Sequence, residues 1–226
     1  LKPLPDTIKQ NSETNITKQE LNGVESTDNE KFNFIIEESA KHPEFVGFGS
    51  IHPDYENFEN ELKRIHEAGL KGIKLHADFQ NFQMDDERMD PLYEVMSSLN
   101  MPVLVHAGDY RYDFSGPKRI LHVLEKHPDL IIIAAHFGGY TEWENSIKYL
   151  VGKNVYFDTS STFWKLPIED AKKIIEAHGY EKFLFGSDFP MWDHSEELAR
   201  FDKLELSPQQ REAVLFGNAD KLLKSL

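Results

Sequence analysis

Six predicted strands in this sequence each end in a histidine or an aspartate, and the spacing of these residues is nearly even. Successive members are 22 to 30 residues apart, in the order His52, His76, His106, His136, Asp158 and Asp188. Each interval has room for one strand, a loop and one helix. Because the carboxyl ends of parallel barrel strands share one face, we expect these side chains to converge. Imidazoles and carboxylates gathered in this way are typical ligands of zinc or manganese, so the pattern predicts an enzyme with a divalent metal.

Three of these residues are expected to carry the chemistry. We interpret His106 in MPVLVHAGD and His136 in IIIAAHFGG as metal ligands, and a strand-end histidine bonded to a backbone carbonyl is the alternative for each. Asp188 in FLFGSDFP is expected to bind the metal and to accept a proton from metal-bound water, with a helix cap as its alternative. Asp158 in VYFDTSS is expected instead to form hydrogen bonds with the nearby Ser and Thr residues.

Other residues near these strand ends could bind a substrate. His76 and Lys74 lie two residues apart in GIKLHAD, so a strand points both side chains the same way, and we assign His76 to substrate binding. Lys74 could bind an acidic group, serve as a carbamylated metal bridge, or pair with a carboxylate as a buried strand lysine. Arg111 is the candidate for anchoring a substrate carboxylate, because its guanidinium donates hydrogen bonds in a fork. Tyr110 and Trp192 are expected to line an apolar pocket for a ring-bearing substrate, and simple loop packing is their alternative.

Composition limits the class of protein. Asp and Glu total 39 against 25 Lys and Arg, and the resulting net charge of −14 disfavours nucleic acid and anionic membranes as partners. The sequence has no cysteine, so thiolate chemistry and disulfides are excluded. No apolar run approaches the length of a membrane span or of a signal sequence. We expect a cytoplasmic protein that acts on a small molecule.

The chain divides into a polar N-terminal arm, residues 1–30, and a domain of alternating strands and helices, residues 31–226. Six βα units are visible, whereas a closed barrel of this kind has eight strands. We therefore predict an α/β fold of the (β/α)8 barrel type that lacks the first two units. Open sheet edges favour association, so a homo-oligomer is expected. Thr141 with Glu144 predicts a capping box, and Ser207-Pro208 predicts another helix start.

Several segments together give the chain a resemblance to a known family. They are KGIKLHAD, VLVHAGDYR, AAHFGG, VYFDTSS, LFGSDFPMW and FGNADKLL. With these segments the chain resembles the amidohydrolase superfamily, specifically the metal-dependent hydrolases related to aminocarboxymuconate semialdehyde decarboxylase. The resemblance implies a (β/α)8 barrel, metal ligation by His106 and Asp188, and a catalytic or ligating role for His136. The family carries His-x-His at the end of its first strand, and this sequence has none, so we expect that segment upstream of Leu1 or a truncated relative.

The main functional prediction is metal-dependent hydrolysis of a C–N or C–O bond in a small molecule. Zinc is the expected metal, with manganese as the alternative. Asp188 would take a proton from the metal-bound water, and His136 would stabilise the oxyanion or protonate the leaving group. A second hypothesis is nonoxidative decarboxylation of an aromatic or muconate-like acid, with Arg111 holding a carboxylate. A third is a non-catalytic relative that acts as a binding or scaffold protein.

Overall fold

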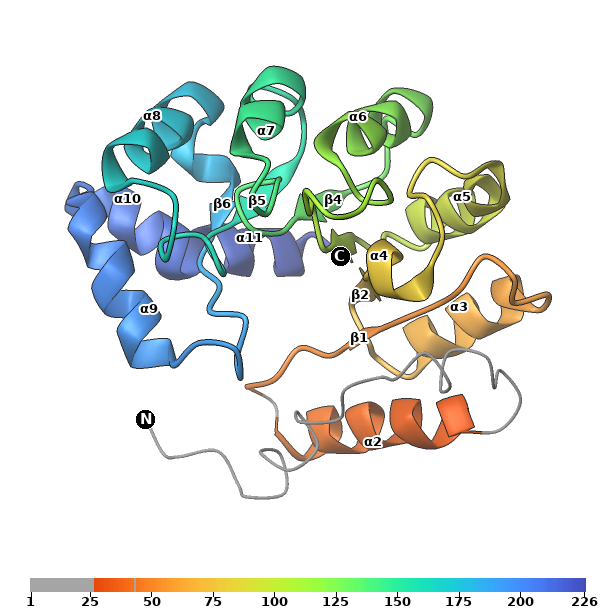
Figure 1. The fold of residues 1–226 in the computed structure, drawn as a ribbon. Coiled ribbons are helices and arrows are strands. Elements are labelled where there is room, and N and C mark those ends of the chain that lie inside the picture. Colours follow the sequence, from red (N-terminus) through yellow and green to blue (C-terminus); the bar gives the residue numbers. More distant parts are fainter. Residues whose placement is uncertain (1–26, 43) are drawn as a thin grey trace.

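The computed structural model describes residues 27–42 and 44–226 and contains a parallel sheet of six strands in chain order (Figure 1). The strands are β1 (Phe48–Gly49), β2 (Gly72–Leu75), β3 (Val103–Val105), β4 (Ile132–Ala134), β5 (Tyr156–Asp158) and β6 (Phe183–Leu184). The helices are α2 (Thr27–Lys41), α3 (Phe58–Glu67), α4 (Ala77–Gln80), α5 (Asp90–Ser98), α6 (Pro117–Lys126), α7 (Trp143–Tyr149), α8 (Ile168–His178), α9 (His194–Phe201), α10 (Pro208–Glu212) and α11 (Asn218–Lys224). Short 3₁₀ turns lie at Glu87–Met89, Tyr180–Lys182 and Asp202–Leu204, and a π-helical turn lies at Ala213–Gly217.

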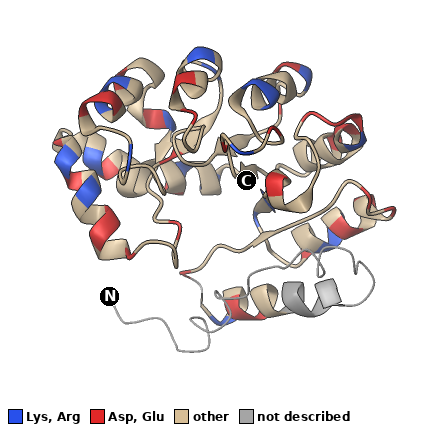
Figure 2. Ribbon diagram, in the orientation of Figure 1, with Lys and Arg blue, Asp and Glu red and all other residues tan. Residues whose placement is uncertain are grey.

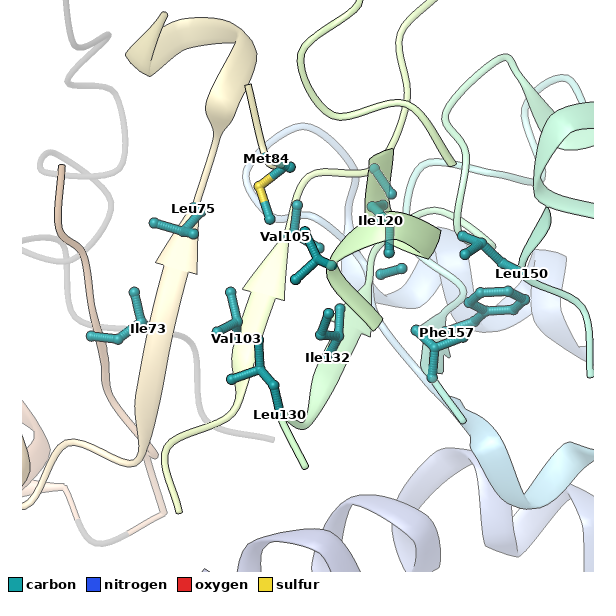
Figure 3. Packing of buried hydrophobic residues seen from close by; sticks show 14 of the residues in the cluster. Ile73, Leu75, Met84, Val103, Val105, Ile120, Leu130, Ile132, Leu150 and Phe157 are labelled. Carbon is teal, nitrogen blue, oxygen red and sulfur yellow. The ribbon is translucent and has the colours of Figure 1, made fainter. Parts of the chain in front are cut away.

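One face of the sheet packs against the helices. Successive strand residues point to opposite faces, and the set that faces the helices is almost wholly buried (Figure 3). This set includes Ile73, Val103, Ile132 and Phe157, each exposed by 1% or less. Helices α3, α5, α6, α7 and α8 form an arc on the outer side of the curved sheet (Figure 1). The strands therefore hold their carboxyl ends in a fixed arc against a dry apolar layer.

The opposite face of the sheet points into the concave side of the arc. Strand register places Lys74 beside Leu104, Leu104 beside Ile133, and Ile133 beside Tyr156. Lys74, Leu104 and Tyr156 are only partly buried, unlike their neighbours on the helix-facing side. Continuing two residues along β2 and β3 leads to His76 and His106, so the strand-end residues rise directly above this inner row.

Helix starts agree with the sequence only in part. Ser207 caps α10 with a full capping box, in which Ser207 Oγ accepts from the Gln210 backbone N–H. The predicted box at Thr141 is wrong, because α7 begins at Trp143 and its N-terminus has no side-chain cap. Thr141 has a φ of +61°, and its hydroxyl instead accepts from the Tyr110 backbone N–H at 3.5 Å. A contact between two loops has replaced the local cap.

The order of strands and helices confirms the predicted α/β barrel sheet with six of its strands among the described residues. The predicted arm, residues 1–30, lies largely outside the described part of the chain, and α2 already begins at Thr27. No helix in the described residues is long and apolar enough to cross a membrane. Figure 2 shows acidic and basic residues interspersed along the outer helices.

Candidate active site

The predicted strand-end residues meet at one edge of the sheet. His76 follows β2 directly, His106 follows β3, and Asp158 is the last residue of β5. His136 and Asp188 come shortly after β4 and β6. Because all neighbouring strands run parallel, these positions share the carboxyl edge of the sheet, as the spacing predicted. His52 follows β1, and its Nε2 lies 3.0 Å from the Gln80 carbonyl oxygen.

Three histidines form the centre of the site. The rings of His76 and His106 stack in parallel with centroids 4.0 Å apart, and Phe79 stacks on the other face of His76 at 3.9 Å. His106 Nδ1 lies 3.0 Å from His136 Nε2. Burial lowers the pKa of His76 to about 4, and burial together with the charges of neighbouring groups lowers the pKa of His106. Both rings are therefore neutral at physiological pH.

The contacts of His136 fix which ring nitrogens carry hydrogen. His136 Nδ1 lies 3.0 Å from the carbonyl oxygen of Ser160, which can only accept, so Nδ1 carries the hydrogen in the tautomer that has a single ring N–H. His136 Nε2 then carries a lone pair and accepts from His106 Nδ1–H. This leaves the lone pair of His106 on Nε2, a buried atom with no hydrogen-bond partner in the described part of the chain. The geometry thus presents the lone pair of His106 Nε2 to a ligand, and His76 Nδ1 is likewise buried without a hydrogen-bond partner among the described residues.

Asp158 holds His136 in place. Its Oδ1 accepts from the backbone N–H groups of His136 and Ser160, both at 2.9 Å, and from Ser160 Oγ at 2.6 Å. His136 has a φ of +61°, a conformation that costs a residue with a side chain about 1–2 kcal/mol, and these bonds stabilise it. Trp143 Nε1 donates to the His136 carbonyl from the other side at 3.1 Å. The expected bonding of Asp158 to nearby hydroxyls is confirmed for Ser160.

Asp188 stands at the exposed rim, and a serine holds it. Ser161 Oγ donates to Asp188 Oδ2 at 2.6 Å and accepts from Trp192 Nε1 at 3.0 Å. An indole N–H only donates, so the hydroxyl proton of Ser161 must point at the carboxylate. Asp188 and Ser161 both have positive φ angles, +56° and +47°. The loops after β5 and β6 are therefore joined by hydrogen bonds at the Asp188 carboxylate.

The residues Arg111, Tyr110 and Trp192, predicted to bind the substrate, differ in their exposure and in the hydrogen-bond partners that they already have. Arg111 forms a forked pair with Asp109, at 2.9 Å from Nε and 2.6 Å from Nη2, and its side chain is 54% exposed. Tyr110 is 71% exposed at the rim. The indole N–H of Trp192 donates to Ser161 Oγ, and the Arg200 guanidinium lies 4.6 Å from the centroid of the Trp192 ring.

The predicted metal triad of His106, His136 and Asp188 is not assembled as a ligand group. His106 and His136 touch each other, but in residues 27–42 and 44–226 no three His, Asp or Glu side chains are arranged to hold a metal. A bound metal would need at least three protein ligands, so His106 Nε2 and the Asp188 carboxylate fit such a site only with further ligands. The described residues alone do not form the site, and metal ligation stays a prediction.

The sequence predicted the bonding of Asp158 to nearby hydroxyls, but not two further contacts of the same segment. Ser160 and Ser161 in VYFDTSS organise His136 and Asp188 respectively. The signal was present, because hydroxyl residues directly after a strand-end carboxylate often bond to it and to the adjacent loop. The partner in the neighbouring loop, Asp188, lies 27 residues away and required the fold.

Comparison of the sequence with known proteins identifies the family of this chain. The sequence model of the amidohydrolase family matches residues 18–224. Gamma-resorcylate decarboxylase from Polaromonas sp. strain JS666 is 26% identical over 248 residues, which cover 84% of this chain and 74% of that protein.

Solved structures share the fold. An uncharacterised TIM-barrel protein from Bordetella bronchiseptica superposes with a TM-score of 0.71 and 23% identity, covering 85% of this chain and 72% of the other. A dihydroxybenzoic acid decarboxylase from Polaromonas sp. JS666 was solved with manganese and the inhibitor 2-nitroresorcinol. It superposes with a TM-score of 0.71 and 21% identity, and the match covers 88% of this chain and 75% of the other. These likenesses establish the TIM-barrel type of fold, and the match over residues 18–224 shows that the chain belongs to the amidohydrolase family.

Proposed function

We propose that this protein catalyses the nonoxidative decarboxylation of a small hydroxylated aromatic carboxylic acid. The observation that carries the proposal is the similarity to gamma-resorcylate decarboxylase, which spans 84% of the chain. The hydrolase prediction gives way to the alternative stated beside it, because the relatives described above that have a named activity are decarboxylases. A small, carboxylate-bearing aromatic substrate follows from the same relatives.

The geometry supports this reaction. In it the aryl carboxylate loses CO₂, and a proton replaces the carboxyl group on the ring carbon, so no oxidant or reductant is consumed. The stacked rings of His76, His106 and Phe79 offer a flat aromatic surface for such a ring. His106 Nε2 can accept a hydrogen bond or a proton from a ring hydroxyl, since its lone pair is free.

Each remaining residue of the site has a positioning or proton-carrying role in the proposal. His136 orients His106 through the 3.0 Å contact, and Asp158 orients His136. Asp188 is solvent-exposed and can exchange protons with water, so it can supply the proton that the ring carbon gains. A divalent metal, manganese in one relative, would polarise the substrate oxygens when bound.

The test is a paired assay on protein supplied with manganese. We expect CO₂ and resorcinol in equal amounts from 2,6-dihydroxybenzoate, and no turnover of benzoate, which lacks the ring hydroxyls. His106→Asn should abolish turnover, whereas the matched change His122→Asn should not, because His122 is an exposed residue of α6 paired with Asp85. Cleavage of aryl esters or amides without CO₂ release would instead support hydrolysis and overturn the proposal.

A further inference from the structure

Lys74 is the charged group of this site that the proposed reaction has not yet used. It lies on the concave face of β2, in register with Leu104, in the row that continues through Ile133 and Tyr156. Its neighbours in that row are apolar or aromatic, and the carboxylates whose charges act on it, Asp158 and Asp188, lie outside the row. Lys74 and Leu104 precede His76 and His106 by two positions and lie on the same face of the sheet, so Lys74 lies beneath the stacked histidine rings.

Lys74 has no ionic partner within the part of the chain that the structure describes. Among the described residues, no carboxylate oxygen lies within 4.0 Å of its Nζ, and Asp158 and Asp188 act on it only through their charges. Both carboxylates are engaged elsewhere, since Asp158 holds His136 and Asp188 accepts from Ser161. Burial lowers the pKa of Lys74, and the two negative charges oppose that effect. Within residues 27–42 and 44–226, the predicted alternative of a lysine paired with a carboxylate is therefore not observed.

An unpaired cation that is partly withdrawn from water is unfavourable, and an anionic ligand group offsets that cost. Arg111, the predicted carboxylate anchor, is in the opposite situation. It is more than half exposed, and Asp109 already neutralises it in a forked pair. An anionic ligand would gain little binding free energy at Arg111, because it competes there with Asp109. It would gain more at Lys74, where no carboxylate of the described residues has to be displaced.

We propose that Lys74, rather than Arg111, binds the carboxylate of the ligand in this barrel mouth. The identity of the ligand as a hydroxybenzoate rests on the proposed function, whereas the preference for an anion does not. Because the carboxylate is lost as neutral CO₂, Lys74 stabilises the bound substrate more than the transition state. Its removal should therefore raise KM without lowering kcat.

The test compares Lys74→Met with Arg111→Met, since both substitutions keep an apolar stem and remove a cation. The probes are benzoate and benzamide, which have nearly the same shape and differ in charge, and calorimetry measures both affinities. The wild-type protein should prefer benzoate, and Lys74→Met should lower that preference by about 10- to 100-fold. Lys74→Arg should retain the preference, and so should Arg111→Met. Unfolding curves check that each variant is folded, and Lys74→Gln replaces Lys74→Met if that variant is not.

Three results would overturn the inference. They are an unchanged benzoate preference in folded Lys74→Met, an equal loss in Arg111→Met, and a mass increase equal to CO₂ on Lys74 in bicarbonate. The last would identify Lys74 as a carbamate and so as an anion itself. None of these results depends on turnover, so they are separate from failure of the proposed function, which would show as absent CO₂ release in the wild-type protein.

Discussion

Removing the hydroxyl of Ser161 tests how Asp188 is held. Ser161→Ala loses the hydrogen bond to the Asp188 carboxylate and the one from Trp192. A hydrogen bond to a charged group contributes about 1.5–3 kcal/mol, and the exposed Asp188 can be solvated by water, so the low end applies. With a smaller loss at the indole N–H, we expect Ser161→Ala to lower the free energy of unfolding by about 2 kcal/mol.

Ser161→Gly removes the same hydroxyl but also relieves the backbone. A φ of +47° costs an L-residue at least about 1 kcal/mol relative to glycine. The glycine variant should therefore be more stable than the alanine variant by about 1 kcal/mol, although it has the smaller side chain. In a chain of 226 residues this difference corresponds to about 2–4 °C in Tm.

Thermal and urea unfolding measure the order of the two variants. Ser160 is the matched control, because its φ lies outside the left-handed region and alanine should there be more stable than glycine. If Ser161→Ala proves as stable as Ser161→Gly, the strain assigned to this residue is refuted. In the decarboxylation assay both Ser161 variants should lose turnover, and an unchanged kcat would show that Ser161 does not position Asp188.

Three further outcomes are expected. The folded protein keeps His76 neutral down to about pH 4 while the unfolded chain takes up protons from about pH 6.5, so stability should fall as the pH falls through that window. The pKa shift of His76 corresponds to about 3 kcal/mol of unfolding free energy at most, and to about 1–2 kcal/mol once the partial exposure of the ring is considered. Urea titrations at pH 7 and pH 4.5 should show a smaller fall in the free energy of unfolding for His76→Gln than for the wild-type protein. Manganese content of the purified variants should drop more in His106→Asn than in His136→Asn, because the free lone pair belongs to His106, and the reverse order would exchange their roles. Leu150→Ala should lower the free energy of unfolding by about 2–5 kcal/mol, since Leu150 is fully buried in the core, and a loss below 1 kcal/mol would contradict that packing.

The sequence was sufficient for the framework of the fold and for the convergence of the site. Apolar strand runs that end in His or Asp at regular intervals predict parallel strands with a shared edge, and this depends on backbone periodicity alone. The helix start at Thr141 failed because its hydroxyl bonds to Tyr110, a residue 31 positions away in another loop. Local propensity cannot anticipate a contact of that separation.

Details of the site were less accessible for a similar reason. The contact between His106 and His136 depends on the left-handed backbone of His136, which no motif in the sequence specifies. The pairing of Arg111 with Asp109 could have been anticipated, because the two residues are only two positions apart in one loop. That Lys74 has no carboxylate partner among the described residues could be seen only in the fold, since it depends on where Asp158 and Asp188 direct their oxygens.

We propose that this chain breaks the bond between an aromatic ring and its carboxylate. The direct measurement follows 2,6-dihydroxybenzoate labelled with carbon-13 in its carboxyl group by NMR, in the presence of the protein and manganese. We expect the label to leave the ring and to appear in CO₂ and bicarbonate, with one unlabelled resorcinol formed for each labelled carbon released. A label that stays on the ring, with the protein folded and manganese bound, would contradict it.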